Sequence, residues 1–181
     1  MPPIKHAAKH AAKQAKKHTP EQEGRKDLRR AYEHLGRVEA IRNLAGDASP
    51  DSVRTLVELA KQYLQSELPK EGADLLRAAE HFSFASLPSN AKADTHVDPK
   101  LMEAVQEEFD KLSTKAEEHW AEHEGRSAEL TRLFEQTSEQ AKAAFDKRKY
   151  RQALELARGA EALAHVHKDP GEGLRRRLPA A

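Results

Sequence analysis

The spacing of the apolar residues constrains the fold of this chain more than any other feature. Large apolar side chains recur every three or four residues from Leu28 to Val166, and no stretch alternates with period two for more than a few residues. This spacing places them along one face of a helix, whereas a half-buried strand needs strict alternation. Each apolar stripe is thin, so every helix must bury its stripe against a neighbour. The sequence therefore predicts an all-α fold of about five helices, packed as antiparallel hairpins in a bundle.

Proline and capping residues predict where the helices begin. A proline in the first turn marks four starts: Pro20, Pro50, Pro69 and Pro99. Thr19 and Gln22 complete a capping box at the first of them. The fourth helix either ends near Gly125 or continues through it, because a single glycine costs a helix only about 1 kcal/mol. The last helix is expected to follow a reversal between Phe145 and Tyr150.

The composition divides the chain of 181 residues into three segments. Residues 1–18 form a basic, low-complexity arm with no large apolar residue after Ile4, so we expect a flexible arm, either a fraying helix or disordered. Residues 19–168 form the helical domain, with a loop predicted at 83–98 because that stretch is rich in small and polar residues. Residues 169–181 are expected to be a flexible tail.

Two predicted helix pairs carry small and bulky residues at a characteristic spacing. Ala60 and Ala79 let two helices approach, while Tyr63 and Leu76 fill the space beside them; Tyr150 and Ala153 repeat part of the pattern. Over about 60 residues this spacing resembles tetratricopeptide repeats. The resemblance implies a protein-binding scaffold without catalysis, and a generic helical bundle is the alternative. The predicted helix-packing residues are Leu59, Ala60, Tyr63, Leu76, Ala79, Phe109, Trp120, Tyr150 and Ala153.

The net charge of +1 hides a segregated distribution of charge. Residues 1–30 carry nine basic and three acidic groups, whereas residues 101–140 are strongly acidic. The candidate polyanion-binding residues are Lys5, Lys9, Lys13, Lys16, Lys17, Arg25 and Lys26. The arm resembles the Ala/Lys-rich tails of histone H1-type proteins, which implies non-specific binding of nucleic acid. Two alternatives stay open: the arm binds the acidic block at 103–139 of the same protein, or it binds nothing.

One string has the spacing of a catalytic metal site. His119, Glu122 and His123 fit the H-x-x-E-H pattern of inverted zinc metallopeptidases, in which both histidines bind zinc and the glutamate is the general base. That family takes a further ligand from a distant carboxylate, and few residues remain downstream here. We therefore expect a solvated helix face, no metal, no cofactor and no catalytic residue, and keep a zinc hydrolase as a remote alternative. His165 and His167 are expected to be surface residues.

The expected function follows from these features together. The chain lacks cysteine, which excludes disulfides and thiol nucleophiles, and fits a cytoplasmic location. No apolar run approaches the ~20 residues of a membrane-spanning helix, so we expect no membrane partner. We expect a non-enzymatic helical scaffold that binds a protein partner. A nucleic-acid-associated protein is the alternative, and the sequence leaves homo-oligomerisation open.

Overall fold

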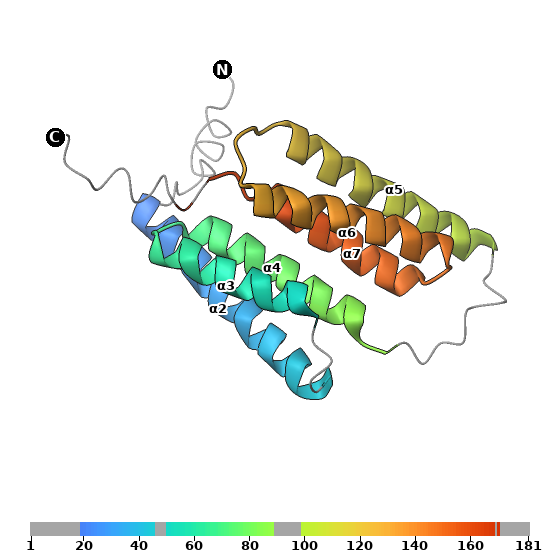
Figure 1. Ribbon diagram of the computed structural model, residues 1–181, viewed down its shortest axis with the longest axis horizontal. Coiled ribbons are helices and arrows are strands. Elements are labelled where there is room, and N and C mark those ends of the chain that lie inside the picture. Colours follow the sequence, from blue (N-terminus) through green and yellow to red (C-terminus); the bar gives the residue numbers. More distant parts are fainter. Residues whose placement is uncertain (1–18, 46–49, 89–98, 169, 171–181) are drawn as a thin grey trace, which may run out of the picture.

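The computed structural model describes residues 19–45, 50–88, 99–168 and 170, and within these residues it contains six helices and no strand. The prediction of an all-α fold is therefore confirmed for the described part of the chain. The helices are α2 (Pro20–Ala45), α3 (Asp51–Gln65), α4 (Pro69–Ser86), α5 (Pro99–Ala121), α6 (Ala128–Asp146) and α7 (Tyr150–Ala164) (Figure 1). No described helix is long and apolar enough to cross a membrane. The basic arm at 1–18 lies outside the described residues.

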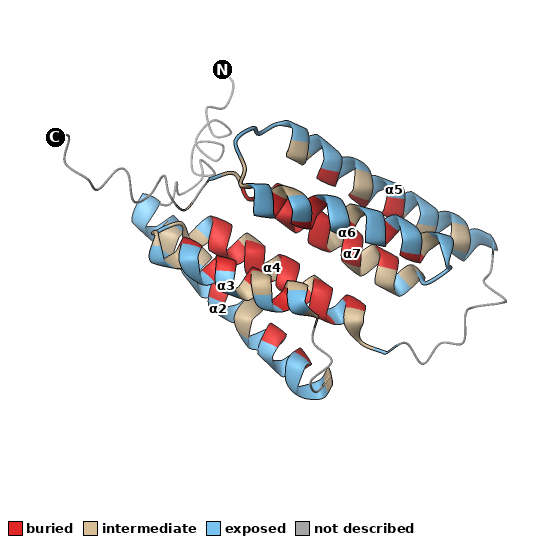
Figure 2. Ribbon diagram, viewed as in Figure 1, coloured by how far each residue is buried: buried red, intermediate tan, exposed pale blue. Residues whose placement is uncertain are grey.

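Helices α4 and α7 form the centre of the molecule. They pack on each other, while α2 and α3 pack on α4, and α5 and α6 pack on α7 (Figure 1). The two central helices are antiparallel, because Lys168 follows α7 and lies 3.8 Å from Glu71 near the start of α4, whereas Arg151 near the start of α7 donates to the Phe84 carbonyl near the end of α4. Buried residues therefore concentrate on α4 and α7 (Figure 2).

The two groups of three helices repeat one design. The α3–α4 and α6–α7 turns each contain one residue in the left-handed region, Glu67 (φ 60°) and Arg148 (φ 57°), and these positions are 81 residues apart. Identical residues recur at the same offset: Glu58 and Glu139, Ala60 and Ala141, Lys61 and Lys142, Leu75 and Leu156, Arg77 and Arg158, Ala79 and Ala160, and Glu80 and Glu161. We call α2–α4 the N-terminal unit and α5–α7 the C-terminal unit of this internal repeat.

A glycine in α7 permits the close contact between the two central helices. A Cβ atom added to Gly159 would lie 2.7 Å from Cδ1 of Phe82 in α4. The equivalent residue of α4 is Ala78, which is fully buried. The position equivalent to Gly159 thus also carries a small, buried residue in α4.

The stretch predicted to be one or two helices after Pro99 consists of two. Helix α5 ends at Ala121, and Gly125 adopts φ 82°, a conformation that favours glycine. Ser127 then caps α6 by accepting a hydrogen bond from the Leu130 amide at 3.2 Å. Gly125 and the Ser127 cap thus separate α5 from α6, and the helix after Pro99 does not continue through Gly125.

The loop predicted at 83–98 begins too early. Helix α4 continues to Ser86, and residues 89–98 lie outside the described part. Ser83 is buried, and its hydroxyl donates to the Ala79 carbonyl at 2.7 Å within the helix. Arg151 of α7 donates to the carbonyls of Phe84 and Leu87 at the end of α4. Tertiary contacts thus extend a helix whose small residues suggested a loop.

The predicted helix-packing residues lie in or against the core. Most of them are buried: Leu59, Ala60, Tyr63, Leu76, Ala79, Phe109 and Ala153. Trp120 and Tyr150 are half-buried. Trp120 stacks on Phe134 with ring centroids 4.1 Å apart, and Tyr150 meets Phe145 edge-on at 5.3 Å. Aromatic pairs therefore fill the space between α5, α6 and the start of α7.

Candidate interaction surface

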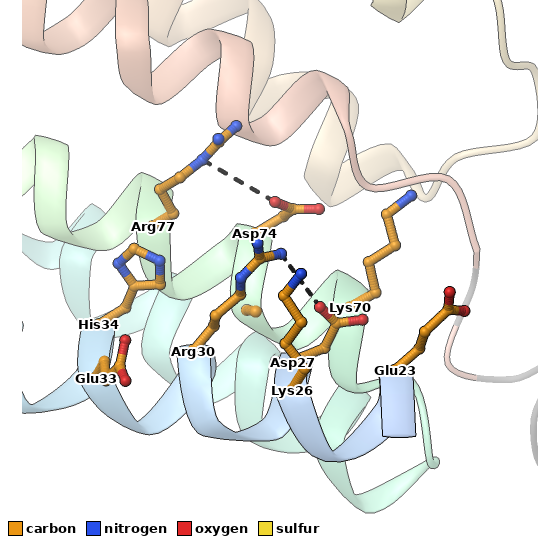
Figure 3. A pocket seen from close by; sticks show the side chains of 10 residues that line it. Glu23, Lys26, Asp27, Arg30, Glu33, His34, Lys70, Asp74 and Arg77 are labelled. Atoms are coloured by element: carbon orange, nitrogen blue, oxygen red, sulfur yellow. Dashed lines mark hydrogen bonds and ion pairs between the residues drawn. The ribbon is translucent and has the colours of Figure 1, made fainter. Parts of the chain in front are cut away.

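A cleft of about 570 Å³ lies between α2 and α4. Its side chains come from two helices only: Glu23, Lys26, Asp27, Arg30, Glu33 and His34 of α2, and Lys70, Ala73, Asp74 and Arg77 of α4 (Figure 3). The α2 residues recur at steps of three and four, which places them on one flank of that helix. The cleft is thus a groove along α2 with α4 as its second wall.

Acidic and basic side chains balance in the cleft, four of each, besides His34. Arg30 Nη1 lies 3.4 Å from Asp27 Oδ1, and Arg77 Nε lies 4.0 Å from Asp74 Oδ1 (Figure 3). The Nε and Nη2 atoms of Arg77 are buried without a hydrogen-bond partner. Since charges of both signs line the cleft, it suits a segment that itself carries both signs better than a small anion or cation.

A partly buried ion pair joins α2 to α4 beside the cleft. His34 Nδ1 donates to Glu80 Oε2 at 2.6 Å, and Arg37 Nη1 lies 3.2 Å from the same oxygen. Burial raises the pKa of Glu80, but the hydrogen bond from His34 and the charge of Arg37 outweigh it, so the pKa falls below its ordinary value. Glu80 is therefore ionised at neutral pH and holds both α2 side chains in place.

Asp74 has the opposite shift. Its burial in the cleft wall raises its pKa, and the nearby charges of Arg77, His165 and Lys70 only partly counter this effect, while Glu71 adds to the rise. Asp74 is therefore easier to protonate than an ordinary aspartate.

The other flank of α2 exposes two large apolar side chains one turn apart. Leu28 is 40% and Tyr32 is 64% exposed. The internal repeat allows the position of Leu28 to be compared between the two units. The equivalent of Leu28 in the C-terminal unit is Phe109, which is buried and stacks on Phe145 of α6 at 4.5 Å. The same position is thus covered in one unit and open in the other.

The structure separates the two described residues of the predicted polyanion-binding set. Arg25 Nη2 pairs with Glu21 Oε1 at 2.7 Å on the exposed surface, while Lys26 lines the cleft. Successive residues of a helix are about 100° apart around its axis, so the two side chains point in different directions. The other residues of that set, Lys5, Lys9, Lys13, Lys16 and Lys17, lie outside the described part.

The string with metallopeptidase spacing lies at the end of α5. His119 Nδ1 is 3.3 Å from Glu122 Oε2, and the rings of His119 and His123 contact those of His165 and His167. In the described residues, no group of three or more His, Asp and Glu side chains is arranged to hold a metal ion. His165 and His167, predicted to be surface residues, are half-buried, and their rings contact those of His119 and His123. Sequence spacing missed this cluster because only the packing of α5 on α7 creates it.

No family model matches the chain, and neither a curated protein nor a solved structure matches it. The functional argument therefore rests on the geometry of its own surface.

Proposed function

We propose that this chain is a non-enzymatic helical scaffold that binds a helix of a protein partner on the exposed flank of α2. The observation that carries the proposal is the exposed pair Leu28 and Tyr32, because Phe109, at the position of Leu28 in the C-terminal unit, is covered by α6. Burying these two side chains stabilises a complex by apolar contact, and tyrosine is favoured at the centres of interfaces.

The surroundings of this pair indicate the chemistry of the partner. Arg25 and Arg29 lie on the same flank, exposed, and in the described part of the chain they pair with Glu21 and Glu33 of their own helix. Exposed pairs of this kind contribute little stability, so acidic partner residues can replace them at small cost. Leu28 and Tyr32 are four residues apart, the spacing at which one helix contacts another. The partner segment is therefore an amphipathic helix with acidic residues beside its apolar stripe.

The experiment compares three forms of the full chain as bait in extracts of cells that produce it. Leu28→Ser with Tyr32→Ser removes the proposed contact, and Leu44→Ser with Leu101→Ser is the matched control, because it removes two exposed leucines elsewhere. We expect the wild type and the control to retain the same partner, and the Leu28/Tyr32 variant to lose it at least tenfold. Capture of the same proteins by all three forms refutes the proposal.

Nucleic-acid binding is the second candidate, supported by the five lysines that precede the first acidic residue, Glu21. If all five contact duplex phosphates, the logarithm of the binding constant falls with the logarithm of salt concentration at a slope of about −4 to −5. Deleting residues 1–18 then abolishes retention on DNA while the helical spectrum remains. Unchanged retention rejects this candidate.

We also place the protein in the cytoplasm as part of the proposal, on the lack of cysteine. Light scattering at low and high salt tests whether it self-associates. A salt-sensitive dimer that survives the Leu28/Tyr32 substitutions would assign another surface to self-association.

A further inference from the structure

Four histidines gather where the end of α5 meets the end of α7. The ring of His119 lies 4.5 Å from that of His165, and the ring of His123 lies 3.7 Å from that of His167, between centroids. His119 lies in the last turn of α5, and His123 lies two residues after the end of this helix. The other two follow α7. The cluster therefore joins the α5–α6 link (residues 122–127) to the end of α7.

Arg126 makes the remaining contacts of this junction. Its guanidinium donates to the carbonyls of Trp120 at 2.7 Å, Ala164 at 3.0 Å and Val166 at 3.0 Å. It also donates to the carbonyls of His119 and His123, and its Cζ lies 4.1 Å from the centroid of the Trp120 ring. A permanent positive charge thus sits at the centre of the histidine cluster.

The two histidine pairs face different charges. His119 lies beside Glu122, and His165 Nε2 lies 3.8 Å from Glu161 and also senses the charge of Asp74 in α4. These carboxylates can compensate a proton on the first pair. The charges that lower the pKa of His167 are those of His123 and His165 when protonated, Lys70 of α4 and Arg126. The acidic neighbour on that side, Glu71, is paired with Lys168.

We propose that the contact between His123 and His167 is a proton-sensitive closure of the junction. With both rings neutral, they stay in their tilted contact and the α5–α6 link stays on the end of α7. A proton on His167 places a new charge near Arg126 and Lys70, so the link leaves α7. The Nδ1 atom of His167 is buried without a hydrogen-bond partner, so a proton there has no acceptor while the junction is closed.

The direction of the pH dependence follows from the closed state. Burial, followed by the charges of His123, Lys70 and Arg126, lowers the pKa of His167 from 6.5 to about 4. The open state binds a proton first as the pH falls below 6.5, so opening becomes more favourable between pH 6.5 and 4. From His167 alone, the opening equilibrium at pH 5 is up to about 30-fold larger than at pH 7.5.

Hydrogen exchange of the full chain measures this equilibrium. The reporter is the Val166 amide, which donates to the Leu163 carbonyl at 3.0 Å, and the reference is the Gly72 amide of α4, which donates to the Leu68 carbonyl at 3.0 Å. All samples contain EDTA. After correction for intrinsic exchange rates, we expect the protection of Val166 to fall by about 30-fold from pH 7.5 to pH 5, and that of Gly72 to stay within threefold.

Two variants assign the effect to the contact. His167→Gln should abolish the pH dependence of protection at Val166. If this variant lowers the overall stability, His123→Gln is used in its place, because His123 is exposed. His123→Gln should reduce the pH dependence of protection at Val166. His81→Gln is the matched control, because His81 Nδ1 is bonded to Glu155 Oε2 at 2.8 Å outside the cluster. The proposal is overturned by a wild-type change below threefold, or by variants of His167 and His123 that both titrate like the wild type.

Discussion

Single residues decide how closely α4 and α7 approach and how α2 is held on α4. Gly159 faces the ring of Phe82, which is buried and only 5% exposed. Glu80 binds His34 and Arg37 of α2 from a buried position in α4. In the internal repeat, Glu80 corresponds to Glu161, so both units have a glutamate at this position. Gly159 corresponds to Ala78, so the glycine occurs in the C-terminal unit only.

The first prediction at this scale concerns the glycine contact. Gly159→Ala should lower the free energy of unfolding by about 1–3 kcal/mol, because the new methyl group overlaps the Phe82 ring. Gly36→Ala in α2 is the control. No atom lies within 4 Å of a Cβ added there, so alanine should raise the free energy of unfolding by about 0.5–1 kcal/mol. Urea denaturation measures both; equal effects of the two substitutions would contradict the close contact.

The second prediction concerns the buried carboxylate. Glu80→Gln should lower the free energy of unfolding by about 1–3 kcal/mol at pH 7, because the amide keeps a hydrogen-bond acceptor and loses the charge. The folded protein holds the pKa of Glu80 below its ordinary value of 4.5, so this contribution is present above pH 4.5 and is lost as the pH falls through the lowered value.

Urea denaturation from pH 7 to pH 3 checks this sign. The control is Glu58→Gln, which removes only an exposed pair with Lys61 and should change stability by less than about 0.5 kcal/mol. A difference between Glu80→Gln and wild type that grows on acidification would show that the ion pair does not stabilise the fold.

At the scale of elements, caps and turn residues explain most helix boundaries. Thr19 and Gln22 form the expected capping box, with the Thr19 amide donating to Gln22 Oε1 at 3.0 Å and the Gln22 amide donating to Thr19 Oγ1 at 3.3 Å. The starts at Pro20, Pro69 and Pro99 were predicted at the right residue. These signals are local, so the sequence carries them. The end of α4 depends on Arg151 of α7, a contact that no local pattern contains.

The prediction at this scale tests the cap that separates α5 from α6. Ser127→Ala removes the acceptor of the Leu130 amide and should lower the free energy of unfolding by about 1 kcal/mol. Ser138→Ala, in the middle of α6, is the control and should cause no loss, because alanine has the higher helix propensity. Equal destabilisation by both substitutions would assign the effect to packing rather than capping.

At the scale of the whole molecule, the internal repeat accounts for the order of the helices. Each unit packs two helices on its third, and the third helices pack on each other. Each unit by itself would leave the buried face of α4 or α7 in water. The two units therefore depend on each other for stability.

This dependence predicts fragment complementation. Fragments 19–88 and 99–168 should each show reduced helicity when alone, and a one-to-one mixture should recover the circular dichroism of the intact chain. Carrying Gly159→Ala in the second fragment should weaken their association, since it acts at the contact between α4 and α7. Two separately stable, monomeric fragments that do not associate would contradict this account.

The sequence by itself determined the helical class and most helix starts, because apolar period, prolines and capping residues act over a single turn. It also marked the residues that pack in each hairpin. Only the tertiary structure decided which helices meet, where the glycine of α7 passes α4, and that His165 and His167 join the histidines of α5. These features join residues about 40 to 80 positions apart, and such pairs are selected by shape and burial after the helices form, which periodicity along the chain does not encode.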